Sequence, residues 1–112
     1  MKNILAQNNN RKKQAHKRGI SYTLMPLTLD KLYREQRCFY LNIPLNVKAE
    51  RFKSITKLTL DRKDPDKGYT KSNVVSSSHI ANQLKNLIES GLITADDVIE
   101  CGKRFKKALS NE

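Results

Sequence analysis

Two side chains that could supply oxygen ligands flank a turn in the middle of the chain. The segment DRKDPDKGYTKSN runs from Asp61 to Asn73, and Asn82 follows nine positions later. An Asp on a strand, a turn with Gly, a second strand and an Asn on the following helix can bring oxygens together around one divalent cation. Such a cation keeps several waters and leaves positions open for phosphate. Because a bound metal stabilises the leaving oxygen in phosphoryl chemistry, these residues predict phosphodiester hydrolysis with Mg²⁺ or Mn²⁺.

The charge of the chain is the second indication of function. It has 22 Lys and Arg against 11 acids, which gives a formal net charge of +11. Residues 1–25 contain six of these cations and no acid. A basic surface of this kind favours contact with nucleic acid. The alternatives are solubility alone, or binding to any polyanion, including ribosomal RNA.

Length and composition exclude several classes of protein. A chain of 112 residues with 38% apolar residues forms one domain at most, with a small core. No apolar run approaches the roughly 20 residues that span a bilayer, and MKNILAQNNNRKK has no apolar stretch typical of a secretory signal. Two cysteines, Cys38 and Cys101, are too few for a disulfide framework or a four-thiolate zinc site. We therefore expect a cytoplasmic protein with free thiols.

The first half of the chain gives weak structural signals. Residues 1–20 are polar and basic, so we expect a flexible arm, which could become helical on phosphate, followed by a single domain over 21–112. Thr28 is a plausible N-cap, and the apolar spacing after it predicts a helix over about 28–37. CFYLNIPLN indicates a short strand or turn, and residues 48–56 are ambiguous.

The elements that must position the candidate ligands lie in the second half. KLTLDR alternates apolar and polar residues, as a strand does, and DPDKG is a turn sequence in which Gly68 allows a positive φ. A second strand starts at Val74. Ser77 or Ser78 can cap a helix that ends at Gly91. That helix carries an apolar face made of Ile80, Leu84, Leu87 and Ile88.

A last helix is predicted over about 95–109. Thr94 and Asp97 have the spacing of a capping box at its start. Its polar side is strongly basic.

The order of strand, turn, strand and helix across residues 58–89 is a ββα unit. The segment LTLDRKDPDKGYTKSNVVSSSHIANQLKN resembles the core of HNH endonucleases, the ββα-metal nucleases, and is most similar to their small phage-type members. The resemblance covers about residues 26–90, and residues 61–86 are its specific part. It implies an α+β fold with a ββα-metal core, flanking helices and a basic N-terminal arm.

The resemblance also implies roles for individual residues. The first Asp of the family core is a metal ligand, which is Asp61 here, and the last signature position, Asn82, completes the metal site. Asn73 matches the Asn that orients the loop through hydrogen bonds. Lys85 matches a basic position that faces phosphate. From the residues alone, Asp61 could instead pair with a neighbouring cation, Asn73 could cap the turn, and Asn82 could face solvent.

The chain departs from the family at the position of the general base. That position is usually His and is Arg62 here, and Arg does not accept a proton from water in proteins. Arg62 could instead hold phosphate through two hydrogen bonds. The base would then be Asp64, His79 or solvent, or there is none. Asp64 could equally be a turn carboxylate, and His79 a surface residue with no role in catalysis.

A second departure concerns structural zinc. Many HNH proteins hold the fold with two Cys-x-x-Cys pairs, and the matching positions here are Cys38, Leu41, Ser78 and Ala81. Because only one of the four is Cys, we expect no structural zinc. Apolar packing of Leu41, Ile43 and Leu45 against Ile80 and Leu84 would replace it. Cys38 would then be a small core residue.

Two functions remain open on the sequence. One is a metal-dependent HNH-type DNA endonuclease or nickase, active in the cytoplasm, or in the host cytoplasm if phage-encoded. The other is an inactive module of the same fold that binds nucleic acid or inhibits a host or defence protein. The residues expected to contact nucleic acid, with double-stranded DNA as the expected partner, are Arg11, Lys12, Lys13, Lys17, Arg18, Lys63, Lys67, Lys85, Lys103, Arg104, Lys106 and Lys107.

Overall fold

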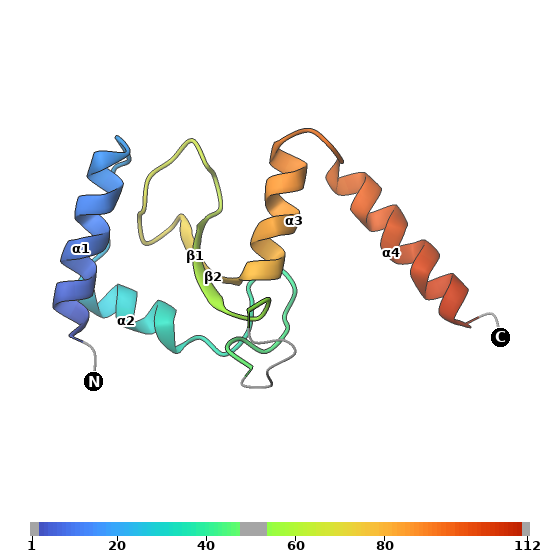
Figure 1. Ribbon diagram of the computed structural model, residues 1–112, viewed down its shortest axis with the longest axis horizontal. Helices are drawn as coiled ribbons and strands as arrows, with labels where there is room; N and C mark the ends of the chain where they lie inside the picture. Colours follow the sequence, from blue (N-terminus) through green and yellow to red (C-terminus); the bar gives the residue numbers. More distant parts are fainter. Residues whose placement is uncertain (1–2, 48–53, 111–112) are drawn as a thin grey trace. The chain divides into compact units, whose positions relative to one another are not determined.

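The computed structural model describes residues 3–47 and 54–110, so part of the ambiguous segment 48–56 lies outside the described residues. The chain divides into two compact units, residues 1–81 and 82–112. This division differs from the expected one, in which a boundary followed residue 20. The fold is a mixture of helices and one two-stranded sheet, and thus α+β as expected (Figure 1).

Most of the residues that were expected to form a flexible N-terminal arm are helical. Helix α1 covers Ile4–Lys17, and the Asn3 side chain caps it by accepting hydrogen bonds from the backbone N–H groups of Leu5 and Ala6. At the other end Gly19 has a φ of 71°, which suits a residue without a Cβ. The N–H groups of Gly19 and Ile20 bond back to the carbonyls of His16 and Ala15, respectively, which closes the helix in a Schellman motif.

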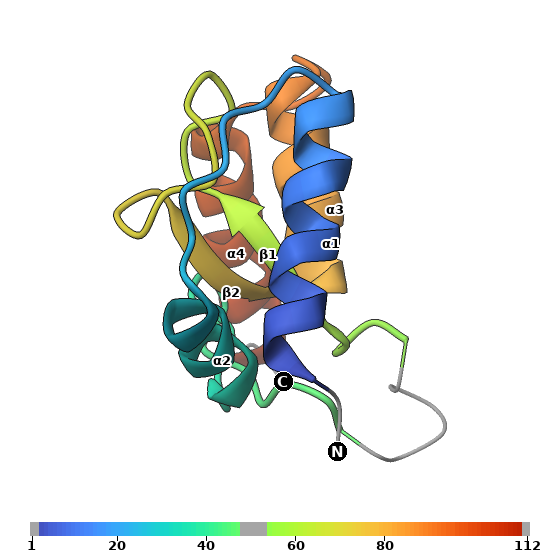
Figure 2. The same cartoon turned by 90° about the vertical axis from the view of Figure 1, so that its left-hand side faces the viewer.

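Helix α1 belongs to the first unit because it buries one narrow face. Asn8 and Ala15 lie on that face with 6% and 3% exposure. The Asn8 amide donates to the Leu24 carbonyl at 3.0 Å and accepts from the Tyr22 hydroxyl at 2.6 Å. Figure 2 shows α1 lengthwise, together with the strand pair.

Helix α2 covers Pro26–Arg34, so it starts and ends earlier than predicted. Pro26 occupies the first turn, where its fixed φ suits a helix and its missing N–H is no loss. Thr28 is therefore not the N-cap but lies inside the first turn. Leu29 is fully buried, and α2 packs against α1 and β2.

Strands β1, Leu58–Arg62, and β2, Val74–Ser78, confirm the two predicted strands. They pair antiparallel, with Asp61 opposite Val75 and Arg62 opposite Val74. Val74 joins a core cluster with Ala15, Tyr22 and Leu24. The loop between the strands is fixed to the segment before α2, because Tyr69 exchanges two backbone hydrogen bonds with Ser21 and Thr23.

Helix α3 covers His79–Glu89 and follows β2 without a break. Ser78, one of the two predicted caps, accepts a hydrogen bond from the Ala81 N–H at 3.2 Å. Gly91 has a φ of 81° after the end of α3, as predicted for a stop residue.

Helix α4 covers Ala95–Ser110 and lies in the second unit. The predicted capping box is present: the Thr94 N–H donates to the Asp97 carboxylate, and the Asp97 N–H donates to the Thr94 hydroxyl. No described residue of α4 is buried. No helix in the described ranges is long and apolar enough to cross a bilayer.

Candidate functional site

Asp61 is the carboxylate around which the candidate site is built. It lies on β1 and is buried, with 8% of its surface exposed. Its Oδ2 accepts a hydrogen bond from the Tyr40 hydroxyl at 2.7 Å. This bond fixes the carboxylate rotamer from a segment outside the sheet. Sequence reasoning missed Tyr40, because an aromatic residue in CFYLNIPLN carries no signal that it reaches the strand.

Arg62 faces away from Asp61, because neighbouring residues of a strand point to opposite faces of the sheet. Its guanidinium Nη1 donates to the carbonyls of Pro65 and Lys67, at 3.0 and 3.1 Å. The guanidinium carbon also lies 5.2 Å from the centroid of the Tyr69 ring. Arg62 therefore braces the β1–β2 loop on the face that carries Val74, and it is not beside the candidate metal ligand.

Asn73 makes the loop contacts that were expected of it. It is 5% exposed, and its amide oxygen accepts from the Asp64 N–H at 3.0 Å. Its amide nitrogen donates to the carbonyls of Asp64 and Gly68 at 3.1 and 2.9 Å. These three hydrogen bonds hold the two sides of the β1–β2 loop together, whatever the function of the loop.

Asp64 has the geometry of the turn carboxylate that the sequence left as an alternative. Its Oδ1 accepts from the Asp66 N–H at 2.9 Å, and its Oδ2 lies 4.0 Å from the Lys67 ammonium. Gly68 does not have the positive φ that the turn sequence suggested. It is needed because a Cβ there would lie 2.5 Å from the Ser21 carbonyl oxygen.

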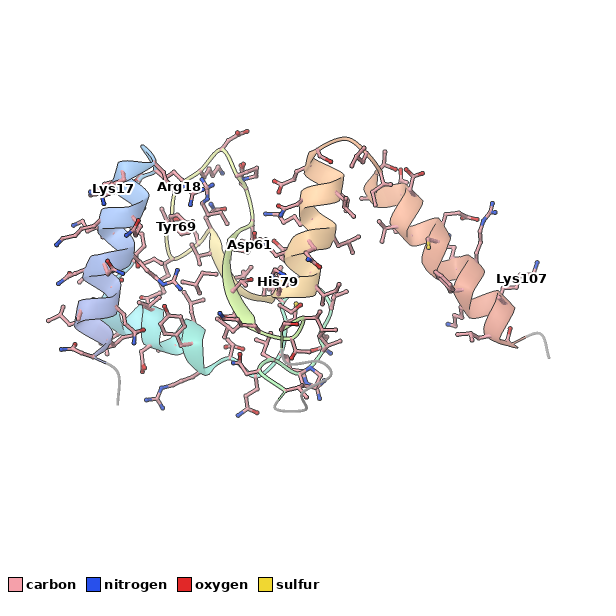
Figure 3. The ribbon with its side chains drawn as sticks, viewed as in Figure 1. Lys17, Arg18, Asp61, Tyr69, His79 and Lys107 are labelled. Atoms are coloured by element: carbon pink, nitrogen blue, oxygen red, sulfur yellow. The ribbon has the colours of Figure 1, made fainter. Side chains whose placement is uncertain are left out.

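His79 and Asn82 lie on α3. His79 is the first residue of the helix, is half-buried, and donates its backbone N–H to the Lys57 carbonyl at 3.0 Å. Figure 3 labels it together with Asp61. Asn82 is half-buried and opens the second unit, so its part in a metal site stays a prediction. Residues 3–47 and 54–110 contain no group of three or more His, Cys, Asp or Glu that could hold a metal ion.

Three of the four positions that match the family's zinc cysteines, 38, 78 and 81, lie in one buried region. Cys38 is 2% exposed, and its sulfur accepts from the Ser78 N–H and hydroxyl, both at 3.3 Å. Cys38, Leu45 and Ala81 form a buried cluster with Ile43 packed against it, which confirms Cys38 as a core residue. Of the expected apolar residues, Ile43 and Leu45 belong to this cluster, whereas Leu41 is 41% exposed. Their packing against Ile80 and Leu84 stays a prediction.

The Cys38 sulfur lies in an environment of hydrogen-bond donors. Burial raises the pKa of the Cys38 thiol, but hydrogen bonds from the Ser78 hydroxyl and from backbone N–H groups lower it by more. The net pKa lies below the ordinary thiol value. These N–H groups belong to Leu41, Ser78 and Tyr40.

The predicted nucleic-acid residues are distributed over both units. Most of them are exposed, and Lys85 is half-buried. Some have protein partners: the Arg104 guanidinium pairs with Glu100 at 3.1 Å, and the Arg11 Nε donates to the Tyr33 hydroxyl at 2.5 Å. The residues on or directly after α1 are Arg11, Lys12, Lys13, Lys17 and Arg18. Those in the β1–β2 loop are Lys63 and Lys67, and those on α4 are Lys103, Arg104, Lys106 and Lys107.

Comparisons with known proteins agree with the fold. No family model matches the chain, and no curated protein matches it. Among solved structures, the chain is similar to the rare-cutting HNH restriction endonuclease PacI, which is described for its mechanism of DNA perturbation. The match has a TM-score of 0.57 and 25% identity, and it covers 96% of this chain and 80% of that one. The likeness supports an HNH-like core here.

Proposed function

We propose that this protein is a metal-dependent HNH-type DNA endonuclease or nickase that hydrolyses phosphodiester bonds. The observation that carries the proposal is the buried carboxylate of Asp61 on the first strand of a ββα unit. The unit occurs in a chain that is similar to an HNH restriction endonuclease over nearly its whole length.

Asp61 is the proposed metal ligand from β1, and Asn82 is the ligand from α3 that the sequence predicts. A carboxylate has about four lone-pair positions, so the Tyr40 hydroxyl can orient Asp61 without occupying it. A hard cation such as Mg²⁺ or Mn²⁺ suits these oxygen ligands. When bound, the metal would polarise the phosphate.

His79 is the proposed general base. Arg62 cannot take the proton and points to the other face of the sheet. Asp64 is held in its turn by Asp66 and Lys67. Imidazole is the side chain that most often serves as a general acid or base in enzymes.

The proposal is tested on supercoiled plasmid with Mg²⁺, with Mn²⁺ and with EDTA. Asp61→Asn keeps an oxygen for the Tyr40 hydroxyl but removes the charge that holds the metal. We expect nicking that needs metal and that is lost in Asp61→Asn. In His79→Ala we expect a loss of at least about 100-fold, the range of general acid–base effects. Asp30→Asn is the matched control, because Asp30 pairs with Arg34 on the surface of α2.

Equal cutting by wild type and Asp61→Asn would contradict the proposed metal site. If Asp61→Asn loses nicking activity and His79→Ala keeps it in full, the proposed metal site is supported and the proposed role of His79 as general base is rejected. Asn82→Ala tests the second ligand in the same assay.

A second candidate function is supported by Arg62, which occupies the position of the family's base. The protein would then be an inactive module that binds DNA without cutting it, since a fold does not guarantee an activity. No cutting with either metal, together with retained DNA binding, would support this module.

A further inference from the structure

A pocket of about 370 Å³ lies in the first unit between α1, α2, β1 and the β1–β2 loop. Its volume falls in the range of about 300–1,000 Å³ that small-molecule sites occupy. Leu60 lines it, and Leu60 and Asp61 point to opposite faces of β1. The pocket is therefore separate from the candidate metal site.

One wall of the pocket is a polar stripe on α1. Gln7, Arg11, Gln14 and Arg18 line it, and their spacing of three or four residues brings them to one side of the helix. The side chains of Gln7, Gln14 and Arg18 have no hydrogen-bond partner within residues 3–47 and 54–110. They are thus available to a ligand.

A second part of the pocket lining is aromatic. Tyr22, Tyr33 and Tyr69 line it, and the rings of Tyr22 and Tyr69 are 5.7 Å apart at 43°. Tyr22 is 5% exposed and is held by its bond to Asn8, so this part is preformed. Figure 3 labels Arg18 and Tyr69, two of the residues that line the pocket.

The charge of the pocket favours an anion. Arg11 and Arg18 line it, and none of its lining residues is acidic. The Arg11 guanidinium is held in place, because its Nε donates to the Tyr33 hydroxyl and its carbon lies 5.5 Å from that ring's centroid. Guanidinium groups bind phosphate with paired donors. Aromatic rings stack on bases, and side-chain amides read the edges of bases.

We propose that this pocket binds one nucleotide unit, its phosphate at Arg11 and Arg18 and its base at the tyrosines and the α1 amides. The nucleotide can come from a DNA strand or from a free mononucleotide, and both offer the same chemistry. The inference goes beyond the proposed nuclease function. Binding here requires neither the metal nor cutting, so either proposal can fail alone.

The test measures binding by the full chain in EDTA, where no metal-dependent cutting occurs. The probes are deoxyadenosine monophosphate, inorganic phosphate and a short single-stranded oligonucleotide. Arg18→Gln removes a pocket cation, and Gln14→Ala removes a pocket amide. Lys31→Gln is the control, because it removes the same charge from an exposed site on α2 that does not line the pocket.

We expect Arg18→Gln to weaken binding of the mononucleotide or of the oligonucleotide by about tenfold, as the loss of one charge-assisted hydrogen bond predicts. Gln14→Ala should weaken binding of whichever nucleotide probe Arg18→Gln affects, but it should not weaken binding of inorganic phosphate. Lys31→Gln should leave the binding of all three probes unchanged. If Arg18→Gln weakens binding of both the mononucleotide and the oligonucleotide, the pocket accepts free nucleotides as well as DNA strands. If it weakens binding of the oligonucleotide alone, the ligand of the pocket is a DNA strand. Unchanged binding in Arg18→Gln, or an equal affinity for inorganic phosphate and the mononucleotide, would overturn the proposal.

Discussion

Replacing Asn73 by alanine removes three hydrogen bonds from the β1–β2 loop at once. The bonds join one buried amide to the Asp64 N–H, the Asp64 carbonyl and the Gly68 carbonyl, at 2.9–3.1 Å. A typical intramolecular hydrogen bond contributes about 1 kcal/mol net. We therefore expect Asn73→Ala to lower the free energy of unfolding by about 3 kcal/mol. For a unit of this size that corresponds to a fall in Tm of roughly 12–24 °C.

Urea unfolding followed by circular dichroism measures this loss. Asn9→Ala is the matched control, because Asn9 is exposed on α1 and its replacement should leave the unfolding midpoint nearly unchanged or raise it slightly. Asn73→Asp keeps the acceptor but sets a carboxylate against two carbonyls, so it should destabilise as much or more. A loss below about 1 kcal/mol in Asn73→Ala would refute the view that this amide holds the loop.

Three further results are expected. Gly68→Ala should lower the free energy of unfolding by about 1–3 kcal/mol, because the new Cβ is overpacked against Ser21. Gly102→Ala has open space around its Cβ and should raise the free energy of unfolding by about 1 kcal/mol. Equal urea midpoints for the two variants would contradict this expectation. Burial raises the pKa of Tyr22 above its ordinary 10.0, against a lowering by Arg11, so its contribution to stability is present below pH 10 and is lost as pH rises through the folded-state pKa. Denaturation from pH 8 to 11 should therefore show a steeper alkaline loss in wild type than in Tyr22→Phe, and parallel curves would be the opposing result. Cysteines placed at positions 41, 78 and 81 beside Cys38 should create a tetrahedral zinc site, visible as Co²⁺–thiolate absorption, and no such absorption would show that the four positions do not converge.

The strands and the last two helices could be predicted because their signals are local. Three signals lie within a few residues of the element that they define. They are the alternation of apolar and polar residues in KLTLDR, the Ser78 hydroxyl that caps α3, and the capping box at Thr94 that starts α4. The same is true of Asn73, whose contacts lie within its own loop. Features that depend on neighbouring residues were therefore predicted from the sequence with few errors.

Helix α1 could not be predicted because its buried face is made by Asn8 and Ala15. A helix that buries one amide and one methyl has no apolar periodicity to detect. Its partners, Tyr22 and Leu24, become visible only when the chain is folded. In the candidate site, Asp61 was placed correctly on its strand, but its contact with Tyr40 depends on packing between distant segments. The opposite orientation of Arg62 follows from the alternation of strand residues and could have been predicted.

The burial of Ala15 against Val74 has a consequence for the order in which the chain folds. The two residues share one core cluster although 58 intervening residues separate them in sequence. Contacts between distant residues slow folding, because the entropy of loop closure is lost before they form. During synthesis α1 leaves the ribosome before β2 does, so it stays without its full packing until β2 has been made. A nascent fragment ending before β2 should therefore be protease-sensitive throughout, including its helical start.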